Sequence, residues 1–322
     1  MNKKRDHHYV FQAYLKRWTN SNEKLWCLLE GKIFDVKTRN IAFEKDFYRI
    51  ATLNDKEKEF IRLFFKKSSD GFKKELENFL NLYTSFDQSQ NVFHKMRSYL
   101  PFDCPEIDST MDEIDSMVDV AKNNVLEDTL AQTEGEACVW LESLCNKNLD
   151  FFCNANDGQN ERFISFLCTQ YYRTKRMKDV TLNVLKKAEE NFVNEQFPKG
   201  SIKASNLYQP MLLLVSSKCS DALLKAKLKL IVNNTSLPFI TSDQPVINTK
   251  ADYTNSSFNS IAELVFYYPI SPKIAILLND ESMSVQEEID DEKTIREFND
   301  LLSKASYNML FADNPDILSE YV

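Results

Sequence analysis

The sequence predicts an α+β fold that is mainly helical and contains a small antiparallel sheet. Glycine and proline are rare, at 5 and 9 of 322 residues, which argues against an all-β chain with many tight turns. Apolar residues recur at helical spacing through the middle of the chain. The β-prone runs are confined to an N-terminal hairpin and to the C-terminal part, so we expect the sheet to form from these two regions.

The N-terminal motif and hairpin occupy residues 1–50. Residues 7–18 are dense in aromatic side chains and suit a short helix, or an extended entry followed by one turn. Residues 25–29 and 33–36 are β-prone and are joined by three residues with a central glycine, which is typical of a hairpin. Residues 40–50 would then lead the chain back to the core.

The middle of the chain, residues 55–230, is expected to be helical. Apolar periodicity predicts helices over residues 55–86, 118–130, 137–149, 160–177, 181–194 and 209–230. The acidic run at residues 106–119 is either a solvated helix face or a loop. A proline and a glycine at residues 197–201 interrupt the helical pattern.

The C-terminal part, residues 235–322, carries the clearest β signals. Residues 237–247 predict a strand, a polar turn and a second extended piece, because Pro245 disfavours the α conformation at Gln244. Two further strands, a helix, and a last strand or helix are predicted at residues 263–272, 274–278, 287–303 and 307–312. This part supplies the C-terminal strands of the predicted sheet.

Charge and cysteine usage narrow the class of protein. A net charge of −8 argues against broad wrapping of nucleic acid, although a nucleic acid bound in a local cleft and a protein partner both stay open. The seven cysteines show no CxxC spacing, which indicates a reducing setting. No apolar run approaches the roughly 20 residues that span a bilayer. We expect a cytoplasmic protein without a membrane partner; its oligomeric state is left open.

Two of the three histidines, His7 and His8, are adjacent in the aromatic N-terminal run. Neighbouring residues cannot point the same way in a helix or a strand, so one can do chemistry while the other packs. Histidine serves as an acid, a base or a metal ligand near neutral pH. The alternatives are an exposed basic terminus or one buried structural histidine.

A second candidate group lies on the predicted helix at residues 160–177. Gln170 and Thr174 share a face with apolar residues, and Arg173 lies beside them. The planar guanidinium of Arg173 suits a phosphate or a carboxylate. A buried hydrogen-bond network for Gln170 and a structural salt bridge for Arg173 are the alternatives.

A third candidate, Asp243, follows Thr241 and Ser242 at the end of a buried-looking strand. Strand ends that open into polar turns often display binding or catalytic side chains. The alternative is an Asx-turn, in which the carboxylate bonds to backbone two residues on. The sequence has no GxGxxG, phosphate loop, HExxH, GxSxG or CxxC motif, so the usual nucleotide-cofactor and zinc sites lack support.

These motif residues also carry a resemblance. The matching stretches are His7-His8-Tyr9-Val10, Gln12, Tyr14-Leu15-Lys16, residues 41–48, Gln170 with Arg173-Thr174, residues 240–246 and residues 268–272. Together they resemble the bacterial domain-of-unknown-function family numbered 4238. The resemblance spans nearly the whole chain and implies a single domain over residues 1–322. The chain departs from the family pattern at Phe11, Gln244 and Lys175, where proline, asparagine and proline are common.

The first functional hypothesis is a phosphodiester-acting enzyme, a nuclease-like effector with a role in bacterial phage defence. Its expected catalytic residues are His7, His8, Arg173 and Asp243. Its expected substrate-binding or supporting residues are Tyr9, Gln12, Tyr14, Gln170, Thr174, Thr241 and Ser242. The second hypothesis is a non-catalytic ligand- or protein-binding module in which the same residues form a buried network. The third is a divalent metal held by one of the two histidines and Asp243; the cofactor is otherwise left open.

Overall fold

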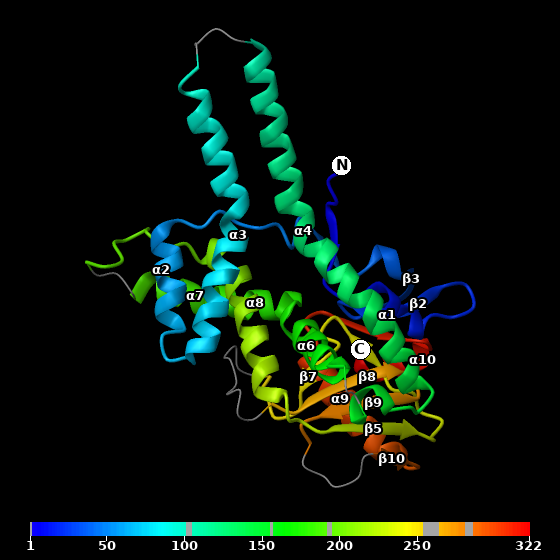
Figure 1. Ribbon diagram of the computed structural model, residues 1–322. Coiled ribbons are helices and arrows are strands. Elements are labelled where there is room, and N and C mark those ends of the chain that lie inside the picture. Colours follow the sequence, from blue (N-terminus) through cyan, green and yellow to red (C-terminus); the bar gives the residue numbers. More distant parts are fainter. Residues whose placement is uncertain (1, 101–104, 155–156, 192–194, 254–263, 281–285) are drawn as a thin grey trace. The chain divides into compact units, whose positions relative to one another are not determined.

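The computed structural model describes residues 2–100, 105–154, 157–191, 195–253, 264–280 and 286–322 (Figure 1). The chain forms two compact units. The helical unit comprises Met1–His7, Glu44–Ala131 and Thr181–Leu214. The sheet unit comprises His8–Phe43, Gln132–Val180 and Val215–Val322. The expectation of one domain over residues 1–322 stays a prediction.

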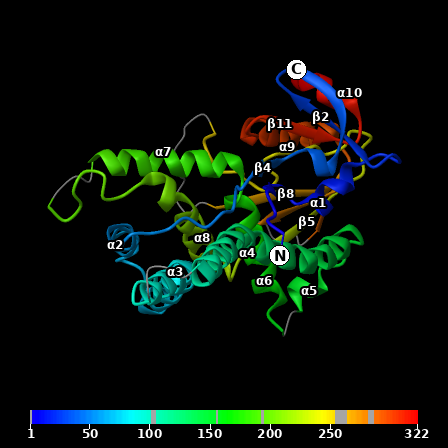
Figure 2. The same ribbon diagram turned by 90° about the horizontal axis from the view of Figure 1, so that it is seen from above.

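The helical unit is built on α2 (Asp55–Phe64), α3 (Asp70–Arg97) and the first part of α4 (Pro105–Cys145). The antiparallel helices α3 and α4 lie side by side in Figures 1 and 2. The region predicted to be helical over residues 55–86 is divided between α2 and α3, because Ser69 caps a new helix: its side chain accepts a hydrogen bond from the Phe72 backbone at 3.3 Å. The acidic run at residues 106–119 is helical, as one of the two alternatives proposed.

The two helices predicted at residues 118–130 and 137–149 form one continuous helix, α4, because no proline or cap separates them. The short α5 (Asp150–Cys153) follows, and then α6 (Gln159–Tyr172). The helix α7 (Lys175–Asn191) starts earlier than predicted, and the predicted helix end at residues 192–194 lies outside the described residues.

The predicted antiparallel sheet is confirmed in the sheet unit, with strand order β3-β2-β11-β6. The N-terminal hairpin supplies β2 (Lys24–Leu29) and β3 (Lys32–Lys37). The C-terminal part supplies β11 (Met309–Ala312) and β6 (Thr241–Ser242). Glu30 and Gly31 form the hairpin turn with φ of 50° and 72°, and a glycine at such a position avoids the steric cost of a side chain.

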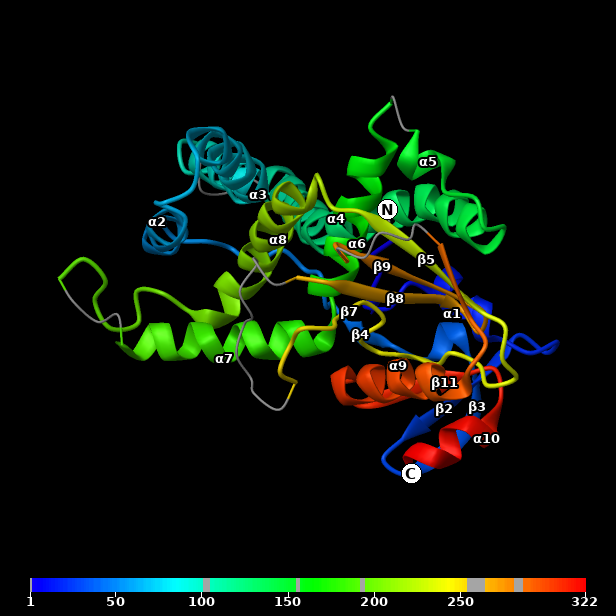
Figure 3. The same ribbon diagram turned by 90° about the horizontal axis from the view of Figure 1, so that it is seen from below.

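A second sheet has five strands in the order β10-β5-β9-β8-β7, whereas the sequence predicted one sheet. Its strands are β5 (Leu228–Asn233), β7 (Ile247–Asn248), β8 (Phe266–Ser271), β9 (Ile274–Leu278) and β10 (Gln286–Ile289). Neighbours pair antiparallel except β10 and β5, which are parallel. Figure 3 shows β5, β9 and β8 side by side. Of the strand predicted at residues 263–272, Glu263 lies outside the described residues.

Two helices have other boundaries than the sequence predicts. The helix expected over residues 209–230 is α8 (Ala204–Leu223), and residues 228–230 belong instead to β5, whose apolar run is buried throughout. The helix expected over residues 287–303 is α9 (Glu292–Ala305), because Asp291 caps it by accepting a hydrogen bond from the Thr294 backbone. The preceding residues are in β10.

The core of the sheet unit joins both sheets to α9. Its buried residues include Ile231 and Tyr267 from the five-stranded sheet, Leu310 from β11, and Ile295 and Leu302 from α9. Figure 3 shows α9 beside β11. Apolar residues of α9 recur at the spacing of one helix face, and this face is the buried one.

The short remaining elements complete the chain. They are β1 (Asp6–His8), α1 (Gln12–Leu15), the 3₁₀ turns η1 (Lys16–Trp18) and η2 (Thr38–Asn40), β4 (Phe43–Lys45), α10 (Pro315–Leu318) and η4 (Ser319–Tyr321). β1 pairs with β4. Among the described residues, no helix has the length and apolar character needed to cross a bilayer.

Candidate functional site

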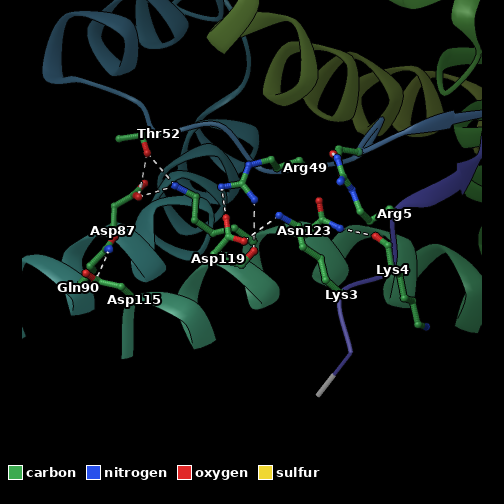
Figure 4. Close-up of polar contacts among 12 residues, drawn as sticks. Lys3, Lys4, Arg5, Arg49, Thr52, Asp87, Gln90, Asp115, Asp119 and Asn123 are labelled. Atoms are coloured by element: carbon green, nitrogen blue, oxygen red, sulfur yellow. Dashed lines mark hydrogen bonds and ion pairs between the residues drawn. The ribbon is translucent and has the colours of Figure 1, made fainter. Parts of the chain in front are cut away.

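The start of the chain is fixed to α4 within the helical unit. The Lys3 ammonium lies 2.7 Å from the Asp119 carboxylate, which also pairs with Arg49 at 2.7 Å (Figure 4). The backbone N–H of Lys4 donates to the Asn124 side chain at 2.9 Å. Chain starts are often frayed unless contacts of this kind hold them. The N-terminal motif is therefore attached to the unit by side chains of α4.

His7 is fully buried, and both of its ring nitrogens bond to backbone groups. Its Nδ1 accepts a hydrogen bond from the Tyr48 N–H at 2.9 Å, and its Nε2 lies 2.8 Å from the Lys4 carbonyl oxygen. A carbonyl oxygen only accepts, so Nε2 carries the proton and the ring is the neutral tautomer. Its ring stacks on Tyr48 with centroids 5.7 Å apart. This arrangement matches the buried structural histidine that the sequence left open.

The burial of His7 also changes its titration. Loss of hydration lowers the pKa of His7 from its ordinary value of 6.5, while the hydrogen bond to Lys4 and the nearby Asp46 act in the opposite direction. Burial has the largest effect. The ring is therefore held neutral under conditions in which an exposed histidine would begin to bind a proton.

His8 belongs to the sheet unit and is only partly buried. The side-chain amide nitrogen of Gln12 lies 2.9 Å from its Nε2, and the Phe43 ring is tilted against it with centroids 5.5 Å apart. Tyr9, the next residue, is buried, and its N–H donates to the Ala42 carbonyl at 3.0 Å. Of the two histidines, His8 is the one with access to solvent.

Arg173 is placed by the end of α6, where it forms the C-cap. One terminal nitrogen donates to the carbonyl oxygen of His8 at 2.6 Å, and the other forms an ion pair with Glu134. The side chains of both charged residues are largely buried, so each neutralises the other where water screens little. This is the structural salt bridge that stood as the alternative to a phosphate site.

Glu134 was not among the site residues predicted from the sequence. It lies three residues before Ala137 and seven before Leu141, both of which are buried on α4. An acidic residue on the apolar stripe of a helix needs a buried cation. That spacing was the available signal, and Arg173 is the cation.

Gln170 and Thr174 are buried as expected. The Thr174 hydroxyl donates to the side-chain carbonyl of Gln244. The Gln244 amide nitrogen in turn donates to the carbonyl oxygens of Tyr171 at 3.1 Å and Val246 at 2.8 Å. The Thr-Ser-Asp-Gln turn is thus joined to the end of α6 by amide and hydroxyl groups.

Tyr14 joins α1 to the strands β6 and β8. Its hydroxyl lies 2.5 Å from the Thr241 hydroxyl and donates to the Pro269 carbonyl at 2.8 Å. Its ring stacks on Tyr268 with centroids 4.8 Å apart. Complete burial raises the pKa of Tyr14, so the hydroxyl stays protonated and acts as a donor.

Asp243 is fully buried, and its carboxylate accepts three backbone hydrogen bonds. The donors are the N–H groups of Tyr307 at 2.8 Å, Asn308 at 2.8 Å and Met309 at 3.1 Å. Burial raises the pKa of Asp243 to about 6, against the opposing effect of these donors. The local turn is closed by Ser242, whose hydroxyl donates to the Gln244 carbonyl at 2.9 Å. The carboxylate itself holds the start of β11.

The predicted site residues therefore form several joined groups. His8 meets Arg173 through its carbonyl oxygen, Thr174 meets Gln244, and Tyr14 meets Thr241. Asp243 bonds instead to the backbone before β11, while His7 belongs to the helical unit. Within the described part of the chain, no group of three or more His, Cys, Asp or Glu residues could hold a metal ion.

An open depression of about 750 Å³ lies on the sheet unit beside the N-terminal motif. It is lined by Ala13, Lys16, Arg17, Cys138, Val139, Glu142 and Ser143. Arg17 lies 3.4 Å from the Glu142 carboxylate, and the Val139 side chain is 69% exposed. An apolar wall with a cationic rim can take a ligand that has an apolar part and an anionic group.

Comparison with known proteins places the chain within a family. No curated protein and no solved structure matches the chain. A family model described as "Protein of unknown function (DUF4238)" matches residues 6–316. This match contains the N-terminal motif, α6 and the Thr-Ser-Asp-Gln turn. Since it spans nearly all of the 322 residues, the chain belongs to the DUF4238 family.

Proposed function

We propose that the protein is a non-catalytic binding module in which the motif residues form a buried structural network. The observation that carries this proposal is that His7 and Asp243 direct their polar atoms to backbone groups. A general base must present a lone pair to its substrate. The described bonds of His7 engage both ring nitrogens, and those of Asp243 engage both oxygens.

The depression beside the N-terminal motif is the proposed ligand site. Val139 and Ala13 supply apolar surface, and Lys16 is an exposed cation at the rim. These groups suit an apolar anion, such as a small carboxylate or a peptide with an acidic residue next to an apolar one. The structural network would keep α1 and η1 in place to form one wall of this site.

The network is tested by the thermal stability of single variants, measured beside cleavage of RNA and DNA. We expect His7→Ala and Asp243→Ala each to lower the free energy of unfolding by roughly 1–3 kcal/mol, because each substitution leaves buried backbone groups without a hydrogen-bond partner. Arg173→Ala should lower the free energy of unfolding by about 3 kcal/mol, because it leaves Glu134 with a poorly solvated charge and no cation to neutralise it. The control is Arg162→Ala on the same helix, whose guanidinium is half exposed and should contribute little.

The proposed ligand site is tested with anilinonaphthalene sulfonate, a fluorescent apolar anion. We expect the folded protein to bind this probe, and Val139→Glu and Lys16→Glu to weaken the binding at least several-fold because both add negative charge to the depression. Lys32→Glu makes the same charge change on an exposed strand end and should bind like wild type. If wild type and the three variants bind the probe equally well, the probe binds elsewhere and the proposed ligand site is wrong.

A phosphodiester-acting, nuclease-like effector of phage defence is the second candidate. It is favoured by the partial exposure of His8, whose carbonyl oxygen is fixed by Arg173 and whose ring is held by Gln12. On this reading His8 acts as acid or base. His8→Ala would then abolish nucleic-acid cleavage, or growth arrest on overexpression, without lowering the melting temperature. A wild-type protein that cleaves and depends on His8 in this way would replace the first proposal.

A further inference from the structure

Arg17 is a largely buried cation in the lining of the depression beside the N-terminal motif, and the chain neutralises it poorly. Its side chain is only 19% exposed. Within the described part of the chain, its one carboxylate partner is Glu142 at 3.4 Å, and the Glu142 side chain is 67% exposed. A buried charge needs a close partner of opposite sign, because it has lost much of its hydration. The distant and well-hydrated Glu142 carboxylate meets this need only in part.

Arg173 shows how the same unit neutralises a buried guanidinium fully. Its carboxylate partner Glu134 is largely buried with it, and a second nitrogen donates to the His8 carbonyl oxygen. The second terminal nitrogen of Arg17 donates instead to the Cys145 sulfur at 3.0 Å. Burial raises the pKa of Cys145 above its ordinary value of 9.0, so this sulfur is a neutral thiol that does not offset the charge. Arg17 therefore has capacity for a carboxylate that the chain does not supply.

A second donor without a partner lies near Arg17. The Tyr268 hydroxyl is fully buried and forms no hydrogen bond with the described residues. The strand β8, which carries Tyr268, packs against η1, which carries Arg17. Burial raises the pKa of Tyr268 well above its ordinary value of 10.0, while the nearby Arg17 guanidinium acts in the opposite direction. The hydroxyl therefore stays protonated, as an unused donor close to a poorly neutralised cation.

The two donors together match the chemistry of a carboxylate. A guanidinium presents parallel N–H groups to the two oxygens of a carboxylate, and these oxygens keep lone pairs for a further donor such as a hydroxyl. A buried polar group without a partner calls for one from outside the chain. Ala13 and Val139 supply the apolar wall of the same depression. The ligand that fits is an apolar molecule with one carboxylate.

We propose that Arg17 and the Tyr268 hydroxyl receive the carboxylate of an apolar monocarboxylate bound in the depression, and that Glu142 competes with this ligand for Arg17. In the free protein the exposed Glu142 carboxylate is the partner of Arg17, and the ligand displaces it. This inference rests on the proposed ligand site. It adds the residues that select a carboxylate and the residue that limits its affinity.

The test compares the binding of naphthoate, a fluorescent apolar carboxylate, with that of its neutral analogue naphthamide. We expect wild type to prefer naphthoate, and Arg17→Gln to bind naphthoate roughly tenfold more weakly, because charge-assisted hydrogen bonds are lost. Binding of naphthamide should change little. Arg17→Lys keeps the charge without the planar fork and should weaken the binding of naphthoate less than Arg17→Gln does. Glu142→Gln removes the competing carboxylate at an exposed position and should bind naphthoate several-fold more tightly.

Tyr268→Phe tests the second donor. Its hydroxyl has no partner to lose, so we expect the variant to melt no lower than wild type and yet to bind naphthoate several-fold more weakly. Tyr267→Phe is the matched control, since its hydroxyl is also fully buried and without a partner among the described residues. Neighbouring strand residues point to opposite faces, and Tyr267 stacks on Phe298 with centroids 4.7 Å apart. This control should bind both probes like wild type.

The proposed carboxylate position is wrong if Arg17→Gln leaves the preference for naphthoate over naphthamide unchanged. Indifference to Tyr268→Phe alone removes this hydroxyl from the site, and indifference to Glu142→Gln alone removes the competitor. Val139→Glu distinguishes these results from failure of the ligand site itself, because it alters the apolar wall that both probes contact. If wild type binds neither probe, or if neither responds to Val139→Glu, the ligand site is wrong and this inference fails with it.

Discussion

At the scale of single residues, His7 shows that a side chain often used in catalysis can instead form hydrogen bonds with two backbone groups. Its neutral imidazole forms hydrogen bonds with the Tyr48 N–H and with the Lys4 carbonyl oxygen, two groups that lie 44 residues apart along the chain. A histidine can do this because its two nitrogens play opposite roles, one accepting and one donating. Protonation would remove the acceptor and break the bond to Tyr48.

His7 should therefore make stability depend on pH. Because burial lowers its folded pKa below 6.5, the unfolded chain binds the proton more readily. The contribution of His7 is complete above about pH 6.5 and is lost as pH falls through the folded pKa. We expect the free energy of unfolding of wild type to exceed that of His7→Gln at neutral pH, and this difference to shrink on acidification. Urea unfolding of both proteins at a series of pH values measures it.

The comparison of two proteins at each pH is needed because Asp243 acts in the opposite direction. Burial raises its folded pKa to about 6, above its ordinary value of 3.8. Its effect therefore favours the folded state increasingly as pH falls toward 3.8. That contribution is common to wild type and His7→Gln and cancels in the difference. A difference that stays constant from neutral to acid pH would show that His7 does not titrate as described.

The sequence indicated the residues of this network better than their partners. The motif position of Asp243 at a strand end was visible, but its three donors begin at Tyr307, 64 residues later. No local pattern specifies a contact over that separation. Arg173 and Glu134 are likewise 39 residues apart, on different helices. The sequence could name a salt bridge as the alternative role of Arg173 and a buried structural position as the alternative role of His7. The partners of these two residues are visible only in the tertiary contacts.

At the scale of elements, the spacing of apolar residues predicted where helices form but did not predict where they begin and end. The break between α2 and α3 depends on the Ser69 cap within a polar stretch, where apolar spacing gives no signal. β10 precedes α9 and is mostly exposed, so its residues lack the alternation that predicts a strand. The N-terminal hairpin was predicted correctly because its turn has a local signal, the glycine at Gly31.

At the scale of the whole molecule, the chain closes its four-stranded sheet from both ends. β11, near the C-terminus, lies between β2 of the N-terminal hairpin and β6. The register pairs Phe311 with Cys27 on one side and with Thr241 on the other. The sequence predicted that these regions share a sheet, because they carry its β-prone runs. It could not predict β11 as an inner strand, since pairing over nearly 300 residues leaves no local trace.

Because β11 lies between β2 and β6, we expect the sheet unit to need this strand in order to fold. A chain truncated after Ser306 loses β11, leaves β2 and β6 with unpaired edges, and removes the three backbone donors of Asp243. The buried carboxylate would then lack its hydrogen bonds, and core residues such as Phe311 would be missing. The combined loss should exceed the roughly 5–15 kcal/mol that stabilises a typical folded protein. We expect the aromatic circular dichroism of the sheet unit to disappear.

A chain truncated after Leu318 is the control. It keeps β11 and α10 and loses only η4 with the last residue, none of which is buried. Its removed contacts include the exposed ion pair between Glu320 and Arg296, which should contribute little. This chain should keep the aromatic signal and melt within a few degrees of wild type. If the chain ending at Ser306 folds equally well, the sheet unit does not need its C-terminal strand, and the backbone donors to Asp243 are dispensable.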